Sequence, residues 1–160
     1  MPADPTLDPF NQLLGTWTTE ATHPKMPGVV VHGTATIEWL EGKQFLILRA
    51  DTDHPDFPDS ISIIGRTEHD RIDPSTHAVA STAGSAPLHM QYFDERGVFR
   101  INETRFEDAK WRWWRDAPGF SQRFTGTFTD SGDTIVGLSQ LREDDVHWTD
   151  DLEITYRRQT

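Results

Sequence analysis

The residues of this sequence best suited to chemistry are His89 and Glu103. If Gly97 lies in a hairpin loop in which Asp94 faces Val98, His89 and Glu103 fall opposite each other on the two strands. A carboxylate that faces an imidazole can orient the ring and favour its charged form, which suits general acid–base catalysis. The same residues can instead form a satisfied polar pair in the wall of a binding pocket, and the sequence favours this second interpretation.

Arg49 and Asp51 form a second candidate group, because residues two apart on a strand point to the same face. The Arg49 guanidinium can bind the anionic head group of a ligand, or the two side chains can form a structural ion pair at a barrel rim. These interpretations are equally open. A hairpin loop at Gly42, in which Trp39 faces Lys43, places Trp39 and Arg49 together on the inward face.

Large aromatic side chains alternate with polar ones on the predicted inward faces. Buried polar groups cost roughly 1 to 3 kcal/mol each when they have no partner, so this mixture predicts a hydrated internal cavity. The residues expected to bind a ligand there are Trp39, Phe45, Arg49, Gln91, Trp113, Gln122 and Tyr156. Other residues assigned to inward faces are Val31, Ala35, Ile37, Ile47, Asp51, Phe93, Phe99, Ile101, Arg105, Trp111, Phe120, Phe124, Gly126, Phe128, Trp148, Leu152 and Ile154.

The composition argues against several other functions. Cysteine is absent, which excludes disulfides, thiol catalysis and Cys-ligated zinc. The 15 basic and 26 acidic residues give a formal net charge of −11, which disfavours nucleic acid as a partner, although residues 110–115 alternate basic and aromatic side chains. His32, His54, His69 and His77 share no metal-ligand spacing, so no metal is expected. Without a run of about 18 apolar residues or a secretory signal, we expect a cytoplasmic protein that does not bind membranes.

The elements that must position these residues are mainly strands. Runs rich in Val, Ile, Thr, Phe and Trp are separated by turns at hairpin spacing, which is typical of an antiparallel meander. Ten strands are predicted, at residues 15–22, 29–40, 44–52, 60–67, 87–94, 98–106, 110–115, 120–129, 134–142 and 146–158, with a further short strand possible at residues 77–80. A short helix is predicted around residues 6–14, with Asp8 as its cap and Gly15 at its end. Closure removes the unpaired edges of a meander, so we expect an all-β, ten-stranded up-and-down barrel with a short N-terminal helix, as one domain over residues 1–160.

Motifs at opposite ends of the chain resemble those of the calycin superfamily of lipocalin-like and fatty-acid-binding-like barrels. Gly15-Thr16-Trp17 opens the first predicted strand, and the run LEITYRR at residues 152–158 closes the last. The resemblance implies that an arginine on the last strand lies over Trp17 and closes one end of the barrel. Arg158 is favoured over Arg157, because Arg158 shares its face with Tyr156.

These motifs, with GTATIEW at residues 33–39 and Phe45-Leu46, look more narrowly like the nitrobindin-like branch, which includes small bacterial proteins of unassigned function. Nitrobindins hold haem through a histidine near the start of the last strand. The matching stretch here reads Thr149-Asp150-Asp151-Leu152, and His147 nearby falls on the opposite face from Leu152. We therefore expect no haem, and no other cofactor is indicated.

These observations favour a small-molecule binding protein that holds a hydrophobic or amphipathic ligand in the barrel cavity. The alternative is a cofactor-free isomerase or cyclase that uses His89 and Glu103 as acid and base in the same cavity. A second alternative is a haem-binding protein on the nitrobindin pattern. The sequence indicates no oligomeric state.

Overall fold

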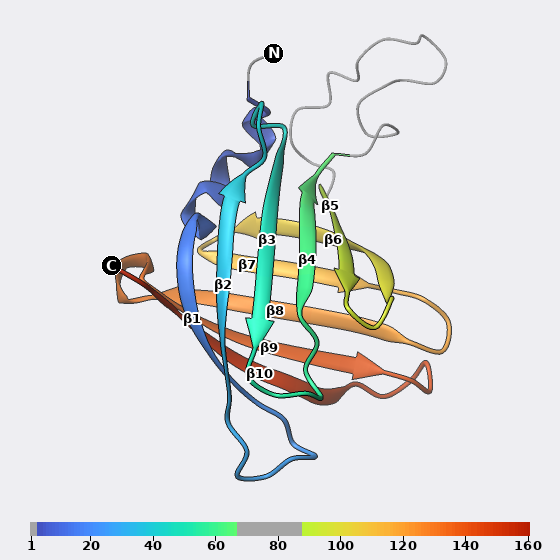
Figure 1. Ribbon diagram of the computed structural model, residues 1–160. Coiled ribbons are helices and arrows are strands. Elements are labelled where there is room, and N and C mark those ends of the chain that lie inside the picture. The colour runs from blue at the N-terminus through green and yellow to red at the C-terminus, as the bar shows by residue number, and fades with distance from the viewer. Residues whose placement is uncertain (1–2, 67–87) are drawn as a thin grey trace, which may run out of the picture.

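In the computed structural model, which describes residues 3–66 and 88–160, ten strands form one closed antiparallel barrel (Figure 1). The strands are β1 (Gly15–Thr22), β2 (Val31–Trp39), β3 (Phe45–Thr52), β4 (Ser60–Gly65), β5 (Leu88–Asp94), β6 (Phe99–Glu107), β7 (Lys110–Arg115), β8 (Ser121–Thr129), β9 (Thr134–Arg142) and β10 (Thr149–Arg158). The same residues form two 3₁₀ helices, η1 (Pro5–Leu13) and η2 (Asp130–Gly132). The predicted all-β barrel is confirmed, while the strand considered at residues 77–80, with His69 and His77, lies outside the described residues.

Closure follows directly from the chain order. Each strand pairs with the next, and β1 pairs with β10. The closing pairs run from Trp17 opposite Arg158 to Thr22 opposite Glu153. The described barrel therefore has no unpaired edge strand. Removal of such edges is the reason why closure was expected from the succession of hairpins.

The two ends of the barrel differ. Helix η1 lies at the end where β1 begins, at the upper left in Figure 1, and buries Leu7, Phe10 and Leu13 in the core of the barrel. We call this the helix end. The opposite end, where β1 finishes and β8 begins, is called the loop end.

The start of η1 differs from the prediction. The carboxylate of Asp4 accepts hydrogen bonds from the backbone N–H (3.0 Å) and the hydroxyl (2.6 Å) of Thr6. Pro5 takes the first helical position, where its missing N–H is not needed. Asp4 is therefore the cap, and the prediction that Asp8 caps this helix is wrong because the helix has already begun.

The inner face is apolar at the helix end and polar at the loop end. Directly paired residues of antiparallel strands point to the same side, so the register identifies the inward residues. The core of the helix end contains Trp17, Ile37, Leu46, Ile64, Leu88, Phe106, Trp111 and Ile135. The inward residues toward the loop end include Ser62, Tyr92, Arg100, Asn102, Arg115, Gln122 and Ser139.

An aromatic stack sits in the middle of the inner wall. Phe124 lies parallel to Trp113, with ring centroids 5.4 Å apart and an interplanar angle of 12°. Gly126 and Gly137 are directly paired on β8 and β9, and a Cβ atom added at Gly137 would lie 2.5 Å from Cε2 of Phe124. Because neither glycine has a side chain, the Phe124 ring can pack directly against the backbone at these paired positions.

The loop between β2 and β3 turns β3 over relative to the prediction. Trp39 pairs with Leu46 rather than Lys43, and Gly42 and Lys43 both have positive φ, of 90° and 53°. This register differs from the predicted one by an odd number of residues, so every side chain of β3 changes face. Leu46, Leu48 and Ala50 point inward with Val31, Ala35 and Ile37 of β2, whereas Phe45, Ile47, Arg49 and Asp51 point outward.

The β5–β6 hairpin has the predicted register and the opposite orientation. His89 pairs with Glu103, as expected. However, Asn102 and Thr104 are buried, so the residues that alternate with them face outward. The predicted inward placement is therefore wrong for His89, Gln91, Phe93, Phe99, Ile101, Glu103 and Arg105.

A β-bulge in β10 changes the predicted face of Trp148. The register of β10 against β9 shifts between Asp150 and Glu153. Trp148 contacts the guanidinium groups of Arg123 (4.0 Å) and Arg142 (4.8 Å) on the outer surface. The prediction of an inward Trp148 is wrong, because an inserted residue breaks the alternation on which it relied.

Candidate functional site

Two arginines point into the barrel toward the loop end. Arg100 pairs with Tyr92, and Arg115 pairs with Gln122. The Arg100 Nη1 atom donates a hydrogen bond to Oε1 of Gln122 (3.3 Å), and Arg115 Nη1 donates one to the carbonyl oxygen of Phe120 (2.8 Å). Both arginines are half-buried, and neither has a carboxylate within ion-pair distance among the residues described.

Phe120 brings the two arginines into one cluster. Its ring centroid lies 4.8 Å from Cζ of Arg100, while its backbone oxygen accepts the hydrogen bond from Arg115. A cation beside an aromatic face gains about 0.5 to 1 kcal/mol at an exposed site, which holds a guanidinium in place but does not neutralise it. The cluster therefore remains cationic.

Asn102 is the polar residue at the site that lacks a partner. Its side chain is inward and only 3% of the residue is exposed, and its Oδ1 atom is buried without a hydrogen bond. Continuation of the β6–β7 register beyond Glu103 opposite Trp114 places Asn102 next to Arg115. An unpaired buried amide oxygen costs about 1 to 3 kcal/mol, and as an acceptor it favours a molecule that presents a hydrogen-bond donor to it.

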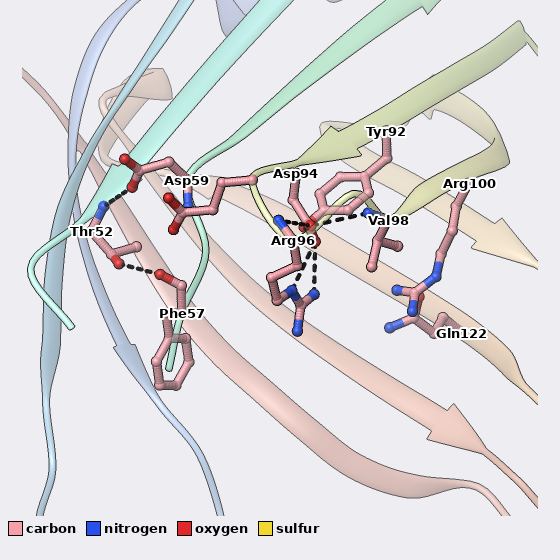
Figure 2. A network of polar contacts seen from close by, with 10 residues as sticks. Thr52, Phe57, Asp59, Tyr92, Asp94, Arg96, Val98, Arg100 and Gln122 are labelled. Atoms are coloured by element: carbon pink, nitrogen blue, oxygen red, sulfur yellow. Dashed lines mark hydrogen bonds and ion pairs between the residues drawn. The ribbon is translucent and has the colours of Figure 1, made fainter. Parts of the chain in front are cut away.

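Asp94, two residues after the inward Tyr92, has its carboxylate fully used by the β5–β6 turn (Figure 2). Its inaccessible carboxylate accepts hydrogen bonds from the Tyr92 hydroxyl (2.9 Å), the Arg96 guanidinium (2.7 and 3.2 Å) and the backbone N–H groups of Arg96 and Val98. The hydrogen bonds from Arg96 hold the pKa of Asp94 well below its usual range. Figure 2 shows the Arg100 side chain turned toward Gln122 instead.

Tyr92 forms the neighbouring part of the wall. Burial, together with the hydrogen bond to Asp94, raises the pKa of Tyr92 to about 12. The hydroxyl therefore stays protonated at neutral pH and donates to Asp94. Tyr92 and Asp94 thus supply no negative charge that is free to pair with Arg100.

A second network holds the β3–β4 loop beside this turn (Figure 2). The Glu95 carboxylate accepts a hydrogen bond from the Asp59 N–H (3.2 Å), and the Asp59 carboxylate accepts one from the Thr52 N–H (3.1 Å). The Thr52 hydroxyl donates to the carbonyl oxygen of Phe57 (2.7 Å). These contacts tie the β3–β4 loop to the β5–β6 turn.

His23 and Asp151 form a polar pair on the β1–β10 side of the loop end. Nε2 of His23 lies 2.8 Å from Oδ1 of Asp151, and Nδ1 of His23 accepts a hydrogen bond from the Lys25 N–H (3.1 Å). Ser139 lies 3.5 Å from the other carboxylate oxygen. Because both ring nitrogens are occupied, the pair ties the β1–β2 loop to the bulge and offers no free proton acceptor.

The apolar wall between the two ends is incompletely buried. Protein interiors are normally close-packed, and several inward side chains here are not completely enclosed by their neighbours. Partly buried hydrophobic residues that pack against the core include Trp39, Ala50, Trp113, Phe128, Ile154 and Tyr156. Burial raises the pKa of Tyr156 to about 12, so its hydroxyl remains neutral.

The residues predicted to bind a ligand divide into two groups. Trp39, Trp113, Gln122 and Tyr156 are inward, and Gln122 belongs to the arginine cluster. Phe45, Arg49 and Gln91 are outward, which corrects their predicted placement. Arg49 makes an exposed ion pair with Glu38 (2.6 Å), so its partner is a residue of β2 rather than Asp51.

His89 and Glu103 are paired on the outer face rather than in an internal cavity. Glu103 is exposed, and His89 lines a small surface pocket with Phe45, Ile63, Gly65, Arg66 and Gln91. The hypothesis of an internal acid–base pair at these positions is therefore wrong, because the hairpin presents its other face to the barrel interior.

The helix end is closed by the predicted contact between Trp17 and Arg158. The Arg158 guanidinium lies 4.1 Å from the Trp17 ring and donates hydrogen bonds to the carbonyl oxygens of Leu14 and Gln12. The indole N–H of Trp17 donates to the carbonyl oxygen of Leu13 (2.8 Å). These bonds join η1 to the last strand.

The sequence reasoning missed Arg100, Asn102 and Arg115. Arg115 shares its face with the inward residues Trp111 and Trp113, so alternation along β7 could have found it. Arg100 and Asn102 were assigned outward by the choice of the more aromatic face of their hairpin. Exposed apolar residues are common on protein surfaces, so that choice had little physical basis.

No protein-family model matches the sequence, and no curated protein matches it. Rv2717c from M. tuberculosis, a solved structure, aligns over 99% of both chains with a TM-score of 0.63 and 14% identity. The S-type phycobiliprotein lyase CPES from Guillardia theta aligns over 94% of this chain and 90% of its own, with a TM-score of 0.55 and 8% identity. This chain shares the barrel fold of these two structures. At these identities the likeness establishes the fold alone.

Two other kinds of site are not found within residues 3–66 and 88–160. No group of three or more His, Cys, Asp or Glu side chains is placed to hold a metal ion. No helix there is both long and apolar enough to cross a membrane.

Proposed function

We propose that this protein binds one small hydrophobic or amphipathic molecule inside the barrel. The observation that carries the proposal is the set of inward hydrophobic residues that remain partly exposed, among them Ala50, Trp113 and Ile154. An apolar wall with a few polar groups at one end is the usual composition of a small-molecule site. The apolar part of a ligand would contact this wall, and its polar part would face Arg100 and Gln122.

The difference between the two ends of the barrel indicates from which end a ligand would enter. Helix η1 and the contact of Arg158 with Trp17 close the helix end. The partly exposed polar residues Tyr92 and Arg100 lie toward the loop end. A ligand would therefore enter from the loop end, with its polar group the last to be buried.

Neither alternative function gains a supporting observation. The His89–Glu103 pair lies outside the barrel, and both ring nitrogens of His23 are occupied. A haem would need an inward histidine with a free nitrogen. His32 and His147 are exposed, and His147 is bound to Asp144 (2.7 Å), so neither is placed to hold a haem inside the barrel.

Titration with phenylnaphthylamine, a neutral apolar dye that fluoresces when it leaves water, tests the proposal. Ala50→Phe fills the interior and should weaken dye binding by at least about tenfold, equivalent to about 1.4 kcal/mol. Val136→Phe adds the same ring on the outer face and should leave binding unchanged. Thermal melting checks that both variants fold, and Ile154→Trp provides a second filled interior.

Equal binding of the dye to the filled and unfilled proteins would contradict a site inside the barrel. No binding by the unaltered protein at dye concentrations up to its solubility would do the same.

A further inference from the structure

We infer that Arg100 and Arg115 form an anion-binding subsite, which takes a carboxylate or phosphate group of the bound molecule. The inference rests on the proposed function, since it identifies the polar end of the same site. Ion pairs are unequally distributed among the arginines of the described chain.

Most arginines in the described residues have a carboxylate within ion-pair distance. These are Arg49, Arg66, Arg96, Arg105, Arg142, Arg157 and Arg158. Arg112 and Arg123 have no such partner but lie exposed on the outer face, where water solvates them. Within the described chain, Arg100 and Arg115 are the arginines that point inward without a carboxylate. A charge that is partly removed from water and unpaired is unfavourable, so this position favours an anion.

The two guanidinium groups belong to one patch of the wall formed by β6, β7 and β8. Gln122 pairs with Arg115 and accepts a hydrogen bond from Arg100, while Phe120 contacts both arginines. Two like charges in one patch repel each other. One anion bound between them would remove the repulsion and replace the lost solvation of both.

The hydrogen-bond inventory leaves donors free for such an anion. Each guanidinium has one hydrogen bond to a protein acceptor in the described residues, from Nη1 to Gln122 or to Phe120. The remaining N–H groups suit the planar, paired recognition of carboxylate or phosphate oxygens. The unpaired Oδ1 atom of Asn102, next to Arg115, is an acceptor and adds no donor to this set.

Nearby acidic residues do not compete for this position. Asp94 is saturated by Tyr92, Arg96 and two backbone N–H groups. Asp116 follows Arg115 in the chain but is exposed and pairs with Arg142 (2.9 Å). The patch is thus a local concentration of positive charge in a chain whose formal net charge is −11.

A matched pair of dyes tests the subsite. Anilinonaphthalene sulfonate carries a sulfonate, whereas phenylnaphthylamine has the same rings without the charge. Arg100→Gln and Arg115→Gln should each weaken binding of the sulfonate dye about tenfold, because a charge-assisted hydrogen bond is lost. Binding of the neutral dye should change less than about twofold. Arg112→Gln, with the same change of charge on the outer face, should affect neither dye, and Arg100→Lys should retain part of the sulfonate affinity.

The outcomes separate the subsite from the proposed function. If both dyes bind and neither arginine substitution selectively weakens the sulfonate dye, the subsite is wrong and the proposed function stands. If neither dye binds, both are wrong. Displacement of the sulfonate dye by octanoate and by octyl phosphate then shows which oxyanion is preferred. Octanol should displace it at least about tenfold less well, and equal displacement by octanol would overturn the inference.

Discussion

Arg157 and Arg158 show how neighbouring residues of one type acquire different roles. Arg157 points outward from β10 and pairs with Glu20 (3.3 Å), and both side chains are about half exposed. Arg158 points inward, covers the buried Trp17 ring and also binds Asp133 (3.1 Å). Alternation along the strand alone separates these two environments.

Substitution of these two arginines by alanine should therefore have unequal effects. Arg158→Ala should lower the free energy of unfolding by about 1 to 3 kcal/mol, because it removes packing, a cation–π contact and bonds to η1. Arg157→Ala should change it by at most about 1 kcal/mol, because exposed ion pairs contribute little. Urea denaturation followed by tryptophan fluorescence measures both. Equal effects would show that the Trp17 contact contributes no stability of its own.

The same residues indicate what a sequence can predict at this scale. The contact between Trp17 and Arg158 could be predicted, because a motif at each end of the chain contains one of these residues. Arg158 shares its strand face with Tyr156, which selects it over its neighbour. Arg49 was placed on the wrong face because its face depended on the length of the loop between Trp39 and Phe45. When a candidate site is inferred from residues that share a face on two strands, an error of one residue in the connecting turn moves the whole second strand to the other face.

At the scale of elements, irregular positions decide which side chains meet. The positive φ at Lys43 extends the β2–β3 loop and turns β3 over. The bulge after Asp150 turns Trp148 outward and leaves Asp151 beside His23. Neither the longer loop nor the bulge is marked by a distinctive amino-acid composition. The strands could therefore be predicted from the sequence, whereas the faces of β3 and of Trp148 could not.

The β8–β9 hairpin provides a prediction of its own. Gly137→Ala should destabilise the protein by about 1 to 3 kcal/mol, because Phe124 is held against Trp113 and cannot move away from the new Cβ. Gly126→Ala, whose Cβ would lie 3.0 to 3.2 Å from its neighbours, should cost less. Thermal melting compares the two, and the reverse order would mean that the Phe124 ring is not fixed as described.

For the whole molecule, closure was predictable because consecutive hairpins leave two edges that a barrel eliminates. The division of the interior was not, since it depends on which face of each hairpin turns inward. The resulting barrel has an apolar end sealed by η1 and a polar end that contains Arg100 and Arg115. This difference between the two ends determines where the proposed ligand would enter and which of its groups would be buried first.

The two tyrosines of the chain report on both ends of this interior. Tyr92 and Tyr156 face inward, and burial is the main cause that raises the pKa of each to about 12. In the unfolded chain both should titrate near about pH 10. The unfolded state therefore loses its protons first, so the free energy of unfolding should be constant below about pH 10 and fall as the pH rises from about 10 to 12, with a slope of up to about 1.4 kcal/mol per pH unit for each tyrosine.

Ultraviolet titration of tyrosinate should consequently show little ionisation of the folded protein at about pH 10.5, whereas the protein in guanidinium should be more than half ionised there. In the Tyr92→Phe variant Tyr156 is the remaining tyrosine, so its titration shows which part of the tyrosinate signal belongs to each residue. Circular dichroism at each pH establishes that the barrel is still folded. Ionisation of either tyrosine near about pH 10 in the folded protein would mean that its hydroxyl is in contact with bulk water, and the interior would then be more open than the proposed binding site requires.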